Sequence, residues 1–415
     1  MDIRKYIITL AKISLTPMSS KRLFAKSNPI IIKVVYSCLH GAFLLILAIL
    51  ALNIDYNFAP EESQIKSTLF IDDLFSTKSD LSGDYTFIDV SASKVVVPRV
   101  DLNGNQVLTD RKALSRLFKQ ISNKPDQPII CDLLFDIETN QDEEFSKTIK
   151  HVNGLIVPFS QEGNQVLNPY LRDVNTGYAG YQQSSGLYSS DKLLKYQYST
   201  PSGAATIPLK IVEQISGMTA RKTLGLLWLK GKVYFNTIIY ENYISISDLD
   251  AAGGKSKLIP LNEIVDLLEA DQKTFYDQFF RGKTIIIGDF SGDLHPTYSG
   301  KVPGSLILAN LIIGFLKGDN QISLSWLLFM LLSFSLLSYL VFYPPIVFEK
   351  VINYFKNTPF GSALVEFFTF FLITGFLSLV SFLLFHKHID VVLISLYLTA
   401  VTLYLEFKAN KKNKL

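Results

Sequence analysis

The stretch FRGKTIIIGDFSGDLHPTYSGKVPGSLILANLIIGFL, residues 280–316, decides how the rest of the sequence is interpreted. Its β-branched run at 284–287 predicts a strand that is buried on both faces. A loop rich in Gly, Ser, Pro and Asp follows, and Pro303-Gly304 precedes an apolar helix over 305–316. A long charge-free segment begins after only five more residues. The loop therefore lies close in sequence to a candidate membrane span, which favours reception and transmission over catalysis.

Four segments of the chain carry few or no charges, and the mean hydropathy of the whole is +0.25. Each segment is about as long as a helix must be to cross a hydrocarbon core of roughly 30 Å, the last only with help from its flanks. We therefore predict four transmembrane helices, over residues 30–53, 323–343, 362–385 and 389–406. A buried or re-entrant helix is the alternative for the last of them. Glu366 is an acid near the start of the third.

The placement of Lys and Arg predicts how these helices are oriented. Basic residues dominate the tails 1–29 and 407–415 and also occur in the loop 344–358. We expect these three segments in the cytoplasm, so that both termini are cytoplasmic in a multi-pass protein of the bacterial inner membrane. Residues 54–322 are then extracytoplasmic. They carry 26 Lys and Arg against 32 Asp and Glu, a net charge of −6, which argues against a nucleic-acid partner for this domain.

Within residues 54–322, strands and helices alternate. The pattern predicts a strand, helix, strand, helix and strand, in that order, at 85–90, 109–121, 128–135, 142–151 and 155–157. Short connections between such elements predict parallel βαβ units. Further on we expect a helix at 208–215, strands within 225–248 and a helix at 262–279. The predicted fold class is an α/β extracytoplasmic domain with a mostly parallel mixed sheet, joined to four transmembrane helices.

Acidic residues follow three of the predicted strands, and the carboxyl ends of parallel strands meet at one edge where ligands bind. The expected ligand-binding residues are Asp89, Arg99, Asp132, Asp136, Asp289, Asp293 and His295. A rim of this kind suits a cation, an amine or a sugar. The alternative for each Asp is a turn or helix cap made through its own backbone. Arg99 is alternatively a structural partner of one acid, and His295 a loop former beside Pro296.

None of the common catalytic or metal-binding motifs occurs in the sequence: HExxH, CxxC, GxSxG and GxxxxGK are all missing. We therefore expect no catalytic residues, no metal ligands and no cofactor, and a protein that is not an enzyme. The alternative is a membrane-anchored hydrolase that uses Asp89, Asp132 and Asp136 as paired carboxylates.

Several motifs together resemble one known family. They are FIDVS at 87–91 followed by Pro98-Arg99, IICDLLFD at 129–136, RGKTIIIGDF at 281–290 and KVPGSLILANLIIGFLKG at 301–318. With three spans after the domain, the pattern over residues 56–407 resembles the type-two CHASE domain, the cyclases/histidine kinases associated sensory extracellular domain of bacteria. The resemblance implies an extracytoplasmic sensory domain that regulates a cytoplasmic output such as a cyclase or a kinase.

Only ten residues follow Leu405, and we expect no output domain among them. The favoured hypothesis is a sensor or receptor subunit that binds an unknown cue and signals to a separate partner through its transmembrane helices. The alternative is a scaffold subunit of a cell-envelope complex that uses the Tyr- and Ser-rich segment 170–200 as its interaction face. Expected partners are the lipid bilayer and a signalling or envelope protein; the sequence leaves a homo-oligomer open.

Overall fold

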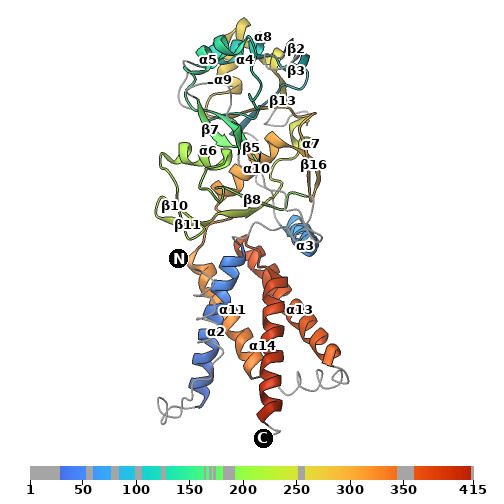
Figure 1. Ribbon diagram of the computed structural model, residues 1–415. Coiled ribbons are helices and arrows are strands. Elements are labelled where there is room, and N and C mark those ends of the chain that lie inside the picture. Colours follow the sequence, from blue (N-terminus) through green and yellow to red (C-terminus); the bar gives the residue numbers. More distant parts are fainter. Residues whose placement is uncertain are drawn as a thin grey trace. The chain divides into compact units, whose positions relative to one another are not determined.

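The structure is a computed structural model that describes residues 29–52, 59–75, 84–98, 105–122, 128–162, 165–167, 171, 174–180, 192–250, 258–343 and 359–412. The chain divides into two units, one of residues Asp55–Gln321 and one of Met1–Ile54 with Ile322–Leu415. The first is an α/β domain and the second is built of helices (Figure 1). Each unit is described by itself.

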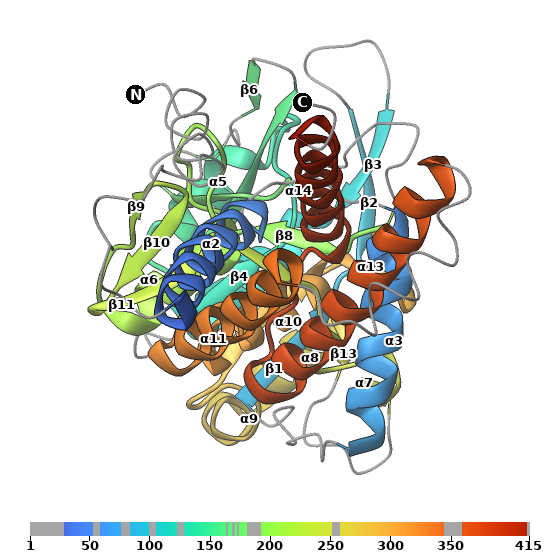
Figure 2. The same cartoon turned by 90° about the horizontal axis from the view of Figure 1, so that it is seen from below.

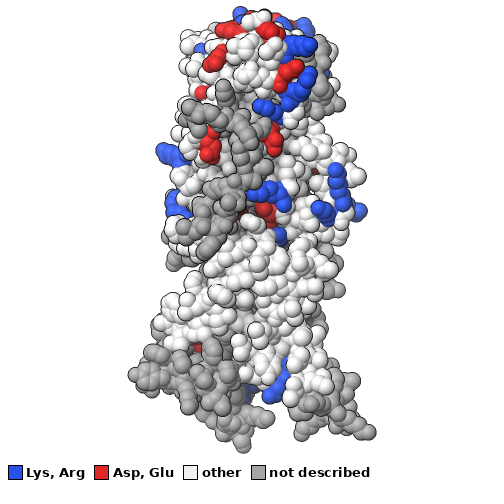
Figure 3. Space-filling model, turned by 180° about the vertical axis from the view of Figure 1, so that it is seen from behind, with Lys and Arg blue, Asp and Glu red and all other residues white. Residues whose placement is uncertain are grey.

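The helical unit contains four helices that are long and apolar enough to cross a membrane. They are α2 (Pro29–Leu52), α11 (Leu324–Phe342), α13 (Pro359–Phe385) and α14 (Val391–Lys412). The described residues of this unit that are visible in Figure 3 include few charged ones, whereas Lys, Arg, Asp and Glu are more numerous on the visible face of the α/β domain. The number and order of these helices, one before the domain and three after it, agree with the sequence prediction.

Close packing and buried polar contacts join the helices of this unit. Helix α2 lies along α11 (Figure 2), and a Cβ atom at Gly41 would lie 2.6 Å from the backbone nitrogen of Ser335, so glycine permits the approach. The His40 ring hydrogen-bonds through Nδ1 to Ser338 Oγ at 2.8 Å and through Nε2 to Tyr397 Oη at 3.1 Å. His40 therefore joins α2 to α11 and to α14.

The α/β domain is built on one seven-stranded sheet with the order β13-β1-β14-β4-β5-β6, in which β7 also pairs with β5. All pairs are parallel except β5 with β6. The strands are β1 (Tyr85–Asp89), β4 (Ile129–Cys131), β5 (Leu155–Glu162), β6 (Gln165–Leu167), β7 (Asn175–Tyr178), β13 (Leu258–Pro260) and β14 (Thr284–Gly288). The predicted mostly parallel mixed sheet is confirmed, and the β-branched run at 284–287 lies in its centre.

Helices cover both faces of this sheet because successive strand residues point to opposite sides. Ile285 and Ile287 pack with α4 (Arg111–Ile121), α5 (Asp142–Ile149), α8 (Leu261–Ala270) and α9 (Gln272–Phe279). Ile286 packs on the other face with α6 (Ile207–Ser216) and α10 (Gly304–Lys317). Alternate side chains of the run 284–287 therefore contribute to two separate hydrophobic cores, one on each face of the sheet.

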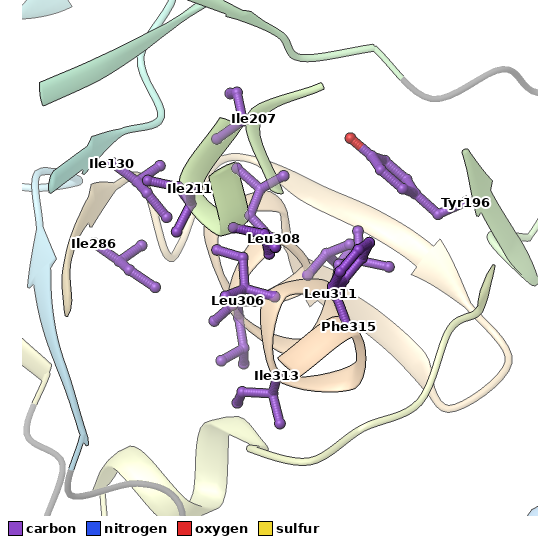
Figure 4. Close-up of a cluster of buried hydrophobic side chains, with 14 of the residues drawn as sticks. Ile130, Tyr196, Ile207, Ile211, Ile286, Leu306, Leu308, Leu311, Ile313 and Phe315 are labelled. Carbon is purple, nitrogen blue, oxygen red and sulfur yellow. The ribbon is translucent and has the colours of Figure 1, made fainter. Parts of the chain in front are cut away.

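Helix α10 occupies the middle of the second core. Side chains from β4, β14, β8 and α6 converge on its apolar residues (Figure 4). Polar contacts hold it as well: Asn310 Oδ1 accepts from the backbone nitrogen of Ile244 at 2.8 Å, and Tyr198 Oη donates to the Leu311 carbonyl at 2.8 Å. An apolar helix that is buried on nearly every side has no amphipathic pattern, as the sequence 305–316 predicted.

Smaller sheets and helices complete the domain, and several of them pack against the second core. They are the pairs β2 (Lys94–Pro98) with β3 (Asn105–Thr109), β8 (Lys195–Gln197) with β12 (Thr237–Ile239) and β15 (Leu294–Thr297) with β16 (Gly300–Pro303), the sheet of β9 (Arg221–Thr223), β10 (Leu226–Leu229) and β11 (Lys232–Phe235), and the helices α3 (Ala59–Phe75) and α7 (Ile246–Asp250). The loop predicted between β14 and α10 is therefore largely a hairpin, β15–β16.

Three predicted elements differ from the structure in their bounds. The helix predicted over 262–279 is interrupted at Asp271, whose φ of −151° is not helical and whose carboxylate accepts from Thr274 N at 3.1 Å to begin α9. The apolar period continues across the break, which explains why the sequence predicted one helix. The strand predicted over 128–135 ends at Cys131, and the strand predicted over 155–157 continues to Glu162.

Helix α10 offers a matched test of the core. Ile312 is 0% exposed and Leu316 is 49% exposed on the same helix. Ile312→Ala should lower the free energy of unfolding of the domain by about 2–5 kcal/mol, because a cavity remains in a core that cannot collapse around it. Leu316→Ala removes similar bulk from the surface and should cost less than about 1 kcal/mol. Denaturant unfolding of the detergent-solubilised protein measures both, and equal losses would show that α10 is not the centre of the core.

Candidate functional site

The first turn of α10 meets the carboxyl end of the central strands. Asp132 follows β4, and its Oδ2 accepts a hydrogen bond of 2.9 Å from Ser305 Oγ. Gly288 ends β14 beside them: a Cβ atom there would lie 1.7 Å from Ser305 Oγ. Glycine at the end of β14 is therefore a condition for the contact between the sheet and the start of α10.

An ion pair lies against the same turn. His295 Nε2 is 2.9 Å from Asp293 Oδ1, and the Asp293 carbonyl accepts from Gly304 N at 2.9 Å. A Cβ atom at Gly304 would lie 2.4 Å from Asp293 Oδ2 and 3.1 Å from His295 Nε2. We call Asp132, Asp293, His295 and Ser305 the α10 entry cluster.

The groups of this cluster change one another's protonation. Loss of hydration, and after it the charge of Asp293, raise the pKa of Asp132 to about 6, against the opposing effects of Ser305 and His295. The hydrogen bond from His295 to Asp293 raises the pKa of the imidazole above its ordinary value. The Asp132 carboxyl, whose pKa is thus raised, lies beside the positive end of the α10 dipole.

Asp89 and Asp289, which follow neighbouring strands, form turns. Asp89 accepts from Ser91 N at 2.9 Å, from Ser91 Oγ at 2.6 Å and from Phe290 N at 3.2 Å. Asp289 accepts from Ser291 N and Gly292 N and pairs with Lys94 Nζ at 2.7 Å; hydrogen bonds from Lys94 and the backbone hold the pKa of its carboxyl below the ordinary value against the effect of burial. Both aspartates thus match the alternative given for them in the sequence analysis, which is that the carboxylate forms a turn with nearby backbone groups.

Asp136 is exposed, and its charge acts on Arg111 rather than on the entry cluster. Arg111 is buried, forms an ion pair with Asp142 and donates to Thr139 Oγ1 at 2.8 Å. Burial lowers the pKa of its guanidinium to about 10, and the charge of Asp136 opposes this effect. Arg99 lies outside the described residues; within the described part of the chain, Lys94 pairs with the rim acid Asp289.

The structure thus brings together three of the predicted residues, Asp132, Asp293 and His295. It adds Ser305, which the sequence analysis missed, although Pro303-Gly304-Ser305 at a helix start was a signal for a close approach. Whether a ligand contacts the predicted residues stays a prediction. A serine acts as a nucleophile when a neighbouring base accepts its proton, and Ser305 Oγ donates its hydrogen bond to the carboxylate of Asp132. Among the described residues no three His, Cys, Asp or Glu are placed to hold a metal ion.

A wide groove of about 1150 Å³ opens at the opposite edge of the sheet. Its lining includes the residues at which β4, β5, β7 and β14 begin, together with the last turns of α6. Lys150, Lys210 and Lys283 line it with one carboxylate, Glu213, which pairs with Lys210 at 3.5 Å. This groove is therefore basic and lies at the amino ends of the strands, not at the predicted carboxyl rim.

Comparisons with known proteins agree with the fold and the membrane layout. A family model described as the CHASE2 domain matches residues 44–340, which is more than half of the chain. Neither the curated proteins nor the solved structures gave a match.

Asp132→Asn tests the electrostatics of the entry cluster. Because the pKa of Asp132 is raised, the folded state binds its proton more tightly than the unfolded chain, so wild-type stability falls as pH rises from about 4 through about 6. Asn is neutral at every pH. The variant should gain about 1–2 kcal/mol on the wild type over this interval, after allowance for solvent screening.

Unfolding followed by tryptophan fluorescence at about pH 4.5 and about pH 7 measures the gain. Glu263→Gln makes the same change in charge at an exposed carboxyl outside the cluster and reports the effect of charge removal alone. A gain for Asp132→Asn that is equal at both pH values would contradict the interpretation.

Proposed function

Because the chain belongs to the CHASE2 family of extracellular sensory domains, we propose that it is a membrane-anchored sensor subunit that binds an extracellular cue and signals to a separate partner through its transmembrane helices. The chain is a membrane protein with an extracellular domain and four candidate spans. The cue, the partner and the direction of signalling are parts of the proposal.

The main support for this proposal is the course of helix α10. It begins at the entry cluster and runs through the second core. It ends at Gly318, whose φ of 85° and whose N–H bond to Phe315 O at 3.0 Å form a left-handed cap. Five residues later Ser323 Oγ accepts from Trp326 N at 3.2 Å and begins α11. A change at the cluster can therefore move a rigid helix whose chain continues, after a short segment, into a span.

The basic groove at the amino ends of the strands is a second candidate site at which the extracellular cue could bind. Helix α6 lines the groove with Lys210, Glu213 and Gln214 and packs on α10 with its buried face. A ligand with negative charge suits the three lysines of the groove. Occupation of the groove can act on α6 and, through its packing, on α10, which gives both candidate sites one common output element.

Three further features belong to the proposal. Both termini lie in the cytoplasm of a bacterial cell and the membrane is the inner membrane, for which the support is the distribution of Lys and Arg. The chain is not an enzyme; the support is that Asp89 and Asp289 are engaged in turns and Asp136 acts on Arg111.

Co-purification tests the separate partner. The protein is cross-linked in its native membranes, solubilised in mild detergent and purified through an affinity tag. The proposal expects at least one additional membrane or cytoplasmic protein at a fixed ratio. Recovery of this chain alone, in one or several copies, would count against a separate partner.

Hydrogen exchange distinguishes a signalling subunit from a scaffold. Ser305→Ala removes the bond to Asp132 at the start of α10, and Ser291→Ala removes a hydroxyl from an exposed turn whose bond to Asp289 comes from the backbone. In lipid nanodiscs, Ser305→Ala should change amide exchange several-fold in α10 and in the first turns of α11, whereas Ser291→Ala should change neither. Changes confined to residues 85–317 would favour a scaffold.

A further inference from the structure

The sheet of β9, β10 and β11 has an outer face that the sensor function does not explain. Leu227, Leu229 and Tyr234 point inward, and Tyr234 stacks on Phe315 of α10 with ring centroids 4.7 Å apart. On the outer face Trp228 lies between its cross-strand partners Arg221 and Val233 and is 46% exposed. A tryptophan beside an arginine is a combination typical of membrane–water interfaces.

The turns of this sheet add to the same surface. Both are two-residue turns with positive φ at each residue, Leu224-Gly225 (53° and 79°) and Lys230-Gly231 (50° and 74°). Such turns favour Asn, Asp or Gly at the first position, yet here that position carries a leucine that is 79% exposed and a lysine that is exposed. An apolar side chain held in water in a disfavoured conformation indicates a contact that removes it from water.

The charge of this part of the chain differs from that of the rest of the domain. Residues 214–240 contain four cations, Arg221, Lys222, Lys230 and Lys232, and no Asp or Glu. The domain as a whole carries more acids than bases. Lys222 is engaged with the carbonyls of Ser199 and Thr200, and the other three are exposed at the surface. A local surface of apolar and basic residues is complementary to anionic headgroups.

The chain connection places this sheet near a span. Phe235 N donates to Asn320 O at 2.8 Å, Asn320 Nδ2 donates to Phe235 O at 2.9 Å, and α11 begins at Leu324. Strand β11 is therefore fixed to a point four residues before the span. Its four residues extend about 14 Å to the turn at Lys230, and the headgroup layer on one side of a bilayer is roughly 5–8 Å thick.

We propose that the outer face of the β9–β10–β11 sheet rests on an anionic lipid surface, with Leu224 and Trp228 at the boundary of the acyl chains and Arg221, Lys230 and Lys232 among the headgroups. The support is the composition of this outer face and the hydrogen bonds between Phe235 and Asn320, neither of which depends on the proposed sensor function.

The two tryptophans of the chain permit a direct test, because Trp326 is fully buried and Trp228 is exposed. The full-length protein is reconstituted into nanodiscs of phosphatidylcholine with about one third phosphatidylglycerol, using lipids brominated near the headgroup end of the acyl chains. Subtraction of the Trp228→Phe spectrum isolates Trp228. Its emission should fall by about half relative to unbrominated lipid and should be protected from aqueous acrylamide.

A charge variant tests the headgroup contact. Arg221→Gln with Lys230→Gln and Lys232→Gln should reduce the lipid quenching of Trp228 by about half or more in the anionic discs. Lys112→Gln with Lys119→Gln and Lys273→Gln makes the same change in charge at exposed positions elsewhere and should leave the quenching unaltered.

Two outcomes overturn the proposal. Quenching of Trp228 by acrylamide and not by brominated lipid places the sheet in water. Protection from both quenchers places a protein there, either a second copy or a partner. The only variant that this comparison needs is Trp228→Phe, which keeps an aromatic ring at an exposed position, so the result does not depend on a substitution in the core.

Discussion

The approach of α10 to the central sheet is the constraint on which the rest of the domain depends. Ser305 occupies the space that a side chain at position 288 would need, so this position must be glycine. Ser305 in turn donates a hydrogen bond to Asp132 at the end of the neighbouring strand. That contact fixes where α10 begins and which of its residues enter the second core. The hairpin β15–β16, the sheet β9–β10–β11 and the connection to α11 all take their positions from this helix.

The sequence is most informative where burial alone decides the structure. A β-branched run such as 284–287 fits a strand with two apolar faces, and an apolar helix without a polar stripe that is too short to cross a membrane fits a core, so β14 and α10 could both be predicted. The break at Asp271 could not, because the apolar spacing of Ile264, Leu268 and Phe275 continues through it. An aspartate can lie within a helix or begin one, and tertiary packing selects between them.

The candidate site was predictable in part for a similar reason. Each of Asp89, Asp132 and Asp289 follows a buried strand, and nothing in the local sequence separates a turn-forming carboxylate from one that meets another element. The difference arises from Ser305, which lies far along the chain from Asp132. The basic groove at the other edge of the sheet gave no signal at all, since its lysines come from separate helices and loops.

The hydrogen bonds of His40 have a consequence for how the helical bundle can move. In a hydrocarbon medium a broken polar contact finds no water to replace it, so rotation of α2 alone would break both hydrogen bonds of His40 without compensation from water. Small independent rotations of α2, α11 and α14 are therefore costly, while movement of the three as one body leaves the bonds intact. We therefore expect these three helices to move together in discrete steps, rather than one helix at a time.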